Sequence, residues 1–394
     1  MTLVVVETHP VQYHAPVYRA LQRDHGVPVT AVYGSDFSVV GFRDPEFGTH
    51  FAWDTDLLSG YSSVFLSRVE SGGARTASEV SARSLFSVLQ NLAPRAVLLV
   101  GYSPRFYQWG VVAALRTRRP LLFRAETTDH AVQRATLKAS LRDALLKHLY
   151  ARCAQLLYIG RRSYQHFKRL GCDDEKLTFS PYCVDTTPFQ VDETARKILR
   201  DATRQELRIP PDRFVVLLSG KLVQRKSPDL LLHAVKHLPS ELRERMHVLA
   251  LGAGAEQPAF EQLAAEHPAV NVACVGFQNQ SRLSAFYHAS DMLVLPSRSA
   301  ETWGLVVNEA LHHGLPCVVS DAVGCAPDLV EPGSTGDVFS SGSVSGLAEA
   351  LQRCLRLVVG EADVRQACRS RVGAYSLDRS AAGIAHAYAA ACPP

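Results

Sequence analysis

The stretch MLVLPSRSAETWGLVVNEALHHGLPCVVSD, residues 292–321, contains a short apolar run, a polar segment, an apolar segment with helical spacing and a second apolar run. Short apolar runs of this kind are typical of buried parallel strands, and the segment between them is long enough for one helix. Thr302 is the expected N-cap, and Gly314 followed by Pro316 marks the expected helix end. The stretch therefore predicts a strand–helix–strand unit of a parallel α/β sheet.

The same alternation extends over both halves of the chain. The first half contains the short apolar runs LVVVE, VTAVYG, AVLLVGY, LLFRAE and LLYIG, separated by longer segments. A polar stretch follows from Asp192 to Arg213, and a second series begins with RFVVLLSGKL. We therefore expect two doubly wound Rossmann-like domains, residues 1–188 and 189–375, and a last helix in residues 376–394 that could pack back towards the first domain. Open α/β sheets bind ligands at the carboxyl ends of their strands, so a ligand cleft is expected between the domains.

The composition limits the class of protein. The chain has 394 residues, of which 47% are apolar and 20% charged, as expected for two globular domains. No stretch approaches the roughly 20 apolar residues of a membrane-spanning helix, and we interpret the N-terminal LVVVE as a strand rather than a signal peptide. Nine cysteines without a C-x-x-C pair argue against a disulfide framework or a structural zinc site. A cytoplasmic protein is expected.

The positive charge is concentrated in the first half. Residues 1–185 carry 22 Lys/Arg against 16 Asp/Glu, whereas the remainder carries 20 against 22. In residues 134–153, RATLKASLRDALLKHLYARC, leucines recur every fourth residue between lysines and arginines, which predicts an amphipathic basic helix. We expect its leucine stripe, Leu137, Leu141, Leu145 and Leu149, to face the core; a surface for anionic lipid or an acidic acceptor is the open alternative. Nucleic acid is not an expected partner, since no recognition motif accompanies the charge.

Two glutamates flank the expected start of the helix in the opening stretch. Glu301 precedes it, and Glu309 lies about 8 to 9 Å further along the axis at 1.5 Å per residue. The backbone N–H groups near Trp303, Gly304 and Leu305 would attract phosphate there. Carboxylates on both sides of a phosphate site, lining a wet cleft, suit a ligand with hydroxyl-bearing rings at both ends of a diphosphate, such as a nucleotide sugar. Two surface glutamates on an ordinary helix are the alternative.

A basic loop could supply the countercharge. In LLSGKLVQRKSPDLLLHAV, an expected strand ends at Gly220, and Lys221, Arg225 and Lys226 follow before the next expected helix. Cations opposite a helix N-terminus can clamp a diphosphate. Taken alone, this loop could equally be a solvated basic loop, so the argument depends on both elements together.

Five motifs in order resemble family 4 glycosyltransferases of the GT-B fold over most of the second domain: GKLVQRKSPDLLLHA, LGAGAE, VGFQNQSRLSAFYHASDMLVLPS, ETWGLVVNEALHHGLPCVVSD and DLVEPGSTG. The resemblance implies an enzyme in which two Rossmann-like domains face a central cleft. Such an enzyme moves a sugar from a nucleotide-diphosphate sugar to an acceptor with retention of configuration, without a metal ion or another cofactor. The acceptor, whether a glycan, a lipid-linked intermediate or a small molecule, is not specified.

The resemblance also implies roles for individual residues. Glu301 would contact the sugar and Lys226 the diphosphate, and these two are the catalytic candidates. Glu309 would hold the ribose. The donor site would comprise Lys221, Arg225, Lys226, Gly276, Phe277, Thr302, Trp303, Gly304, Leu305 and Glu309, with Gly276 and Phe277 near the nucleobase.

The first domain resembles the family less closely, as expected for the side that binds the acceptor. Many members have a glycine-rich loop after the first strand, where this chain has HPVQYHAPVYRAL. His9, Tyr13, His14 and Glu126 are the acceptor-side candidates in this domain.

Other functions remain open at this point. Asp54 and Asp56 in WDTDLL have the D-x-D spacing with which GT-A glycosyltransferases hold a metal ion, but no surrounding pattern supports that fold. A nucleotide-sugar epimerase or hydrolase, or a noncatalytic nucleotide-sugar-binding protein, would share the donor site. A periplasmic sugar-binding protein is disfavoured by the basic loop.

Overall fold

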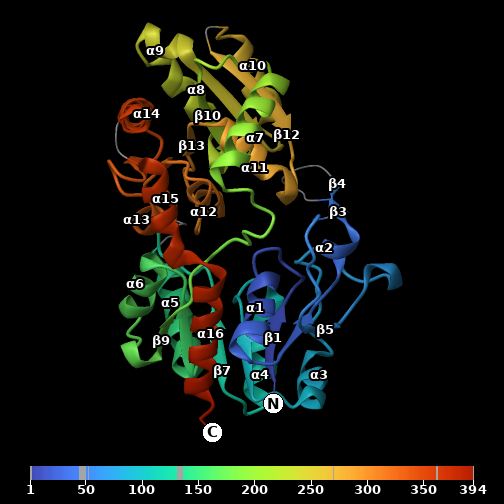
Figure 1. The fold of residues 1–394 in the computed structure, drawn as a ribbon. Helices are drawn as coiled ribbons and strands as arrows, with labels where there is room; N and C mark the ends of the chain where they lie inside the picture. Colours follow the sequence, from blue (N-terminus) through green and yellow to red (C-terminus); the bar gives the residue numbers. More distant parts are fainter. Residues whose placement is uncertain are drawn as a thin grey trace.

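The computed structural model describes residues 2–43, 50–51, 53–130, 136–268, 270–360 and 363–393. Figure 1 shows two α/β domains, one above the other. The first contains a parallel sheet with the strand order β5-β2-β1-β6-β7-β8-β9. Its strands are β1 (Leu3–Glu7), β2 (Val29–Tyr33), β5 (Ser62–Phe65), β6 (Ala96–Leu99), β7 (Leu121–Arg124), β8 (Gln155–Tyr158) and β9 (Leu177–Phe179), and β3 (Phe42–Arg43) pairs separately with β4 (His50–Phe51).

Helices cover both faces of this sheet. They are α1 (Ala15–His25), α2 (Phe37–Val40), α3 (Leu85–Leu92), α4 (Arg105–Arg116), α5 (Thr136–Arg152) and α6 (Arg161–Arg169). In β1, Val4 and Val6 belong to the core beneath α3 to α6, whereas Leu3 and Val5 belong to the core beneath α1. Because alternate side chains of a strand point to opposite faces, the continuous apolar run of β1 supplies both cores.

The second domain repeats this arrangement with the parallel order β12-β11-β10-β13-β14-β15. Its strands are β10 (Phe214–Ser219), β11 (Met246–Leu251), β12 (Asn271–Gly276), β13 (Met292–Leu295), β14 (Cys317–Ser320) and β15 (Gly336–Phe339). Its helices are α7 (Glu193–Glu206), α8 (Pro228–Lys236), α9 (Ser240–Arg245), α10 (Gln257–Ala265), α11 (Leu283–Ala289), α12 (Leu305–His312), α13 (Ala326–Leu329), α14 (Val344–Val359) and α15 (Val364–Val372). The predicted fold class, two Rossmann-like α/β domains, is confirmed.

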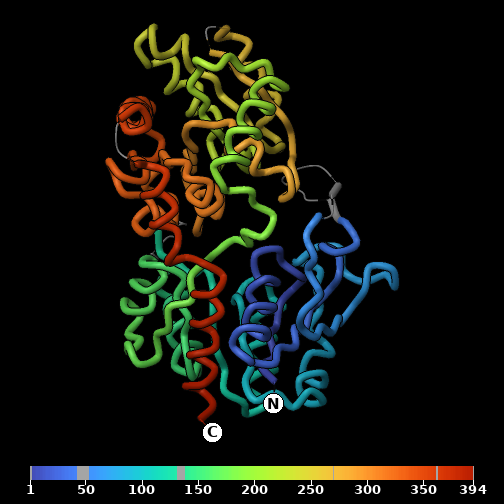
Figure 2. The backbone as a smooth tube through the Cα atoms, in the orientation of Figure 1, coloured from blue at the N-terminus to red at the C-terminus, as the bar shows by residue number. Residues whose placement is uncertain are grey.

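The last helix, α16 (Leu377–Ala391), returns to the first domain. It packs against α1, β8 and β9, as the red segment of Figure 2 shows. A Cβ atom at Gly383 would lie 2.1 Å from the carbonyl oxygen of Phe179, so only glycine permits this close approach. The buried guanidinium of Arg124 donates hydrogen bonds to Ser180 and to Ser380 of α16, which joins the sheet to the helix.

The leucines of α5 form the expected core stripe only in part, since Leu149 packs against the core whereas two others do not. Leu141 and Leu145 are both 64% exposed, whereas Leu146 and Tyr150 are buried; the side chain of Leu137 and residues 134–135 lie outside the described residues. The expectation that these leucines face the core is therefore wrong for Leu141 and Leu145.

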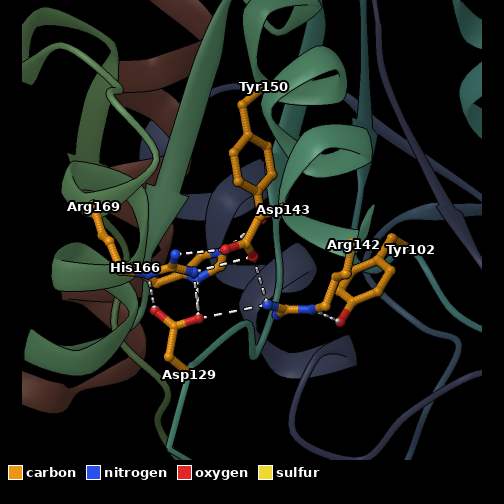
Figure 3. Close-up of polar contacts among 7 residues, drawn as sticks. All are labelled: Tyr102, Asp129, Arg142, Asp143, Tyr150, His166 and Arg169. Atoms are coloured by element: carbon orange, nitrogen blue, oxygen red, sulfur yellow. Dashed lines mark hydrogen bonds and ion pairs between the residues drawn. The ribbon is translucent and has the colours of Figure 1, made fainter. Parts of the chain in front are cut away.

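The burial of Leu146 and Tyr150, together with an ionic network (Figure 3), fixes the rotation of α5. The Arg142 guanidinium lies 3.4 Å from carboxylate oxygens of Asp129 and Asp143, and the same two carboxylates bind Arg169 of α6. Asp129 also pairs with His166, and Arg142 donates to Tyr102. With Arg142 turned inwards, Leu141 and Leu145 are left on the solvent side of the helix.

Two further features concern the class of protein. All nine cysteines are free thiols. Within the described ranges, no helix is long and apolar enough to span a membrane.

Candidate functional site

A pocket of about 630 Å³ lies where the two domains meet. The loop after β1 contributes His9 and Tyr13, and the loop after β10 contributes Lys221. Trp53 and Arg75 of the first domain complete its aromatic and basic lining. Both loops follow the carboxyl ends of parallel strands, which is where open α/β sheets bind ligands.

The two catalytic candidates, Glu301 and Lys226, contact each other in the second domain. Lys226 ends the short 3₁₀ turn Gln224–Lys226, and Glu301 lies in the loop between β13 and α12. The Lys226 ammonium forms an ion pair with Glu301 Oε2, to which the Ser297 hydroxyl also donates at 3.1 Å. Glu301 is only 8% exposed, so the expected wet surroundings are not found. The ammonium of Lys226, rather than water, stabilises the charge of the Glu301 carboxylate.

Helix α12 begins two residues later than expected. It starts at Leu305, and Gly304 at φ 100° takes the N-cap position. A Cβ atom at Gly304 would lie 3.0 Å from Leu295 and 3.1 Å from Val323, so the position requires glycine for space as well as for conformation. No side chain in the described residues caps this helix start, which leaves backbone N–H groups for an anion.

Thr302 was expected to be the N-cap, and its hydroxyl instead donates to Glu126 Oε2 of the first domain. The loop that carries Glu301 is therefore tied across the domain boundary to an acceptor-side candidate. A contact to a residue so far away in sequence competes with local capping, which is why the N-cap prediction for Thr302 is wrong.

Trp303 is not among the residues that line the pocket. Its side chain is 3% exposed, its indole N–H donates to Asn308 Oδ1 at 2.8 Å, and its ring packs against Tyr182 and Tyr375. Trp303 can therefore contribute its backbone to a ligand site, while its side chain joins the domains. Leu305 likewise packs against the core of the second domain.

Glu309 is buried within α12 and is 7% exposed. The Tyr287 hydroxyl donates to Glu309 Oε2 at 2.6 Å. Burial raises the pKa of Glu309 to about 7, against the opposing hydrogen bonds from Tyr287 and Gln280. The expectation that this carboxylate lines a wet cleft is wrong, because α11 covers it. A buried carboxylate with a perturbed pKa is typical of functional sites.

The remaining donor-side candidates lie on separate loops. Lys221 lines the pocket, whereas the backbone carbonyl of Arg225 accepts a hydrogen bond from the Arg298 amide. Gly276 ends β12 at φ 71°, and the following Phe277 faces Trp53 of the first domain at 6.2 Å between ring centroids. The contact between Trp53 and Phe277 was not predicted from the sequence, because only the two aspartates of WDTDLL were considered as functional residues.

Those aspartates have other partners. Asp54 Oδ2 accepts hydrogen bonds from the amide and hydroxyl of Ser281 across the domain boundary. Asp56 accepts from the amides of Leu58 and Ser59 within a turn. The two side chains do not converge, and no cluster of three potential metal ligands occurs in the part of the chain that the structure describes.

The acceptor-side candidates separate into two groups. His9 and Tyr13 line the pocket; burial lowers the pKa of His9 to about 4, and burial raises the pKa of Tyr13 well above its ordinary value. Both side chains are therefore neutral near pH 7. His14 lies behind them, with its Nδ1 2.5 Å from Glu7 Oε1.

Glu7 is a buried residue that sequence reasoning missed. It is 1% exposed and also accepts a hydrogen bond from the Tyr18 hydroxyl. The sequence feature that could have indicated a buried carboxylate is the single glutamate at the end of the apolar run LVVVE. It orients the ring of His14 from the end of β1.

Comparisons with known proteins agree with this fold. Residues 200–370 match a family model described as "Glycosyl transferases group 1". The full chain superposes on a glycosyltransferase from Rickettsia africae with a TM-score of 0.71 at 13% identity, covering 100% of this chain and 99% of that one. An Anabaena protein, HepE in complex with UDP and glucose, gives 0.70 at 16% identity over 98% of each chain. The molecule has the GT-B fold.

Similarity in sequence to curated relatives is more restricted. A D-inositol 3-phosphate glycosyltransferase from Streptomyces bingchenggensis is 35% identical over 165 residues, which are 39% of this chain and 35% of the relative. This chain spans about a third to a half of the length of the curated relatives that it matches.

Proposed function

We propose that this protein is a glycosyltransferase, which moves a sugar from a nucleotide-diphosphate sugar to the hydroxyl of an acceptor. One observation carries the proposal: Glu301 and Lys226, from different loops, meet beside the α12 N-terminus, with Glu309 further along the same helix. The match of residues 200–370 to group 1 glycosyl transferases supports it, because all three residues lie within that range.

In this proposal the diphosphate replaces Glu301 as the partner of Lys226. Lys221 and the N–H groups of α12 add further positive potential, and charge-assisted contacts of this kind hold phosphate strongly. Glu301, released from its ion pair, then faces the sugar. Glu309 accepts hydrogen bonds from the ribose, and Phe277 contacts the nucleobase.

Transfer would proceed with retention of configuration and without a metal ion. The bond between the sugar carbon and the diphosphate oxygen breaks, and a bond from the same carbon to the acceptor oxygen forms on the same face. The acceptor proton passes to the departing diphosphate. Lys226 and the helix N-terminus stabilise the negative charge that grows on the leaving group, and Glu301 stabilises the positive charge that grows on the sugar ring.

The acceptor would enter the pocket that His9, Tyr13 and Trp53 line. Neutral His9 and Tyr13 can donate and accept hydrogen bonds without adding charge. Contacts between the domains, such as Thr302 with Glu126, would exclude water and so limit hydrolysis of the donor. The free thiols are compatible with a reducing cytoplasm, where nucleotide sugars are available.

A screen with purified protein tests the proposal. Nucleotide sugars and nucleoside diphosphates are first ranked by the increase in melting temperature that each causes, since a ligand of the folded state stabilises it. Release of nucleoside diphosphate is then measured with and without a panel of sugar, lipid-linked and small-molecule acceptors. Acceptor-dependent release supports transfer. Release that no acceptor accelerates indicates a hydrolase, and binding without turnover indicates a noncatalytic protein; either result would refute the proposal.

A further inference from the structure

One face of the first domain exposes large apolar side chains. Trp109 on α4 is 61% exposed, and Leu141 and Leu145 on α5 are each 64% exposed. Helices α4 and α5 cover the same face of the sheet, because residues of both helices pack into one core. A single exposed apolar side chain is normal on a protein surface, whereas several on one face are informative.

The exposed stripe of α5 is basic as well as apolar. Lys138, Leu141, Leu145, His148 and Arg152 are all exposed and follow one another at intervals of three and four residues. This spacing aligns them along one side of the helix. Asp143 is the one acidic residue of α5, and it is engaged by Arg169 instead of lying on the stripe.

The neighbouring helix continues the same chemistry. A hollow of about 580 Å³ lies between α3 and α4, and Phe86, Phe106 and Trp109 form apolar walls. Arg83, Arg105 and Arg116 also line it, together with the single acidic residue Glu79. A surface with basic side chains around apolar ones is complementary to a partner that is negatively charged at its surface and apolar beneath it.

We propose that this face, defined by Trp109, Leu141 and Leu145 with the cations Lys138 and Arg152, docks onto an anionic lipid bilayer. Leucine side chains insert below the headgroups, tryptophan favours the interface, and lysine and arginine attract anionic lipid. The burial of Leu146 and Tyr150 in the core and the inward-turned Arg142 of Figure 3 together leave both leucines outside.

Docking would also place the interdomain pocket near the bilayer. Helices α4 and α5 begin at the carboxyl edge of the sheet, and Ser103 and Pro104, directly before α4, line that pocket. Ser78 lines both the pocket and the hollow between α3 and α4. The docking face is therefore continuous with the site, although it does not depend on the proposed transfer reaction.

Sedimentation with vesicles tests the docking face. The intact protein is mixed with vesicles of phosphatidylcholine alone or with added phosphatidylglycerol, at low and high salt. We expect binding to the anionic vesicles only, weakened by salt. The variant Leu141→Ser/Leu145→Ser should bind on the order of tenfold more weakly, because two partly inserted leucines are lost. Lys138→Gln/Arg152→Gln should lose about fivefold per charge.

Ile198→Ser is the matched control, because Ile198 is 63% exposed on α7 of the second domain. It should bind vesicles like the unaltered protein. All variants should keep the same melting temperature, since the altered side chains are exposed. The proposal is overturned if the unaltered protein ignores anionic vesicles, or if Ile198→Ser loses as much binding as the leucine variant. It is also overturned if the leucine variant binds anionic vesicles normally. A further refuting outcome is that the unaltered protein is a dimer and the leucine variant a monomer, because the face would then bind a second copy of the chain.

Discussion

Glu309→Gln should make the protein more stable at alkaline pH. The carboxylate is 7% exposed, and burial raises its pKa from the ordinary 4.5 to about 7. A folded state in which an acid has a raised pKa binds the proton more tightly than the unfolded chain does. Its stabilising contribution is therefore complete below pH 4.5 and is lost as the pH rises through 7.

The size of the effect follows from these two pKa values. At about 1.4 kcal/mol per pKa unit, complete ionisation of Glu309 lowers the free energy of unfolding by about 3 kcal/mol. Between pH 5 and pH 8 the loss is about 2 to 3 kcal/mol, because ionisation in the unfolded chain is already under way at pH 5. Glutamine cannot ionise, and its amide oxygen can still accept the hydrogen bond from Tyr287. The variant should therefore escape this loss.

Urea unfolding of both proteins at pH 5, 6, 7 and 8 measures the difference. All other titratable groups are shared, so the change in the difference with pH reports Glu309. We expect the variant to gain about 2 to 3 kcal/mol relative to the unaltered protein from pH 5 to pH 8. A difference that stays constant with pH, or that changes in the opposite direction, would refute the reasoning.

The same ionisation should govern donor binding. With a pKa of about 7, roughly one tenth of Glu309 is ionised at pH 6 and nine tenths at pH 8. If ribose hydroxyls require the carboxylate, the donor KM of the unaltered protein should fall by about tenfold over this range. The Gln variant should have a high KM without this pH dependence, with kcat nearly unchanged.

Three other predictions concern the diphosphate and the sugar. Lys226→Ala should weaken nucleoside diphosphate binding by roughly 1.5 to 3 kcal/mol, measured by calorimetry, while nucleoside binding stays normal; an equal loss of both would make the lysine structural. Glu301→Gln should lower kcat by on the order of a hundredfold and keep or raise diphosphate affinity, because Lys226 loses its internal counterion; full turnover would refute the role of Glu301. Activity should survive EDTA. A loss of activity that manganese restores would refute the metal-independent reaction and favour Asp54 and Asp56 as metal ligands.

The sequence by itself determined the class of fold and identified the loops that carry the candidate site residues. Continuous apolar runs and helical spacing are local signals, so strands such as LVVVE and LLFRAE could be recognised without knowledge of their neighbours. The basic loop and the glutamates were also identifiable, because their motifs are short and contiguous. The close approach of Glu301 to Lys226 joins two such motifs, and only the folded chain displays it.

Tertiary structure decided what each motif contacts. Thr302 donates to Glu126 instead of capping α12, Tyr287 helps to bury Glu309, and the core packing of α5 together with the network around Arg142 turns Leu141 and Leu145 outwards. In each case the deciding partner is distant in sequence. Helical spacing indicates which side chains share a face of a helix, but the rest of the fold determines which face becomes buried and which carboxylate loses its water.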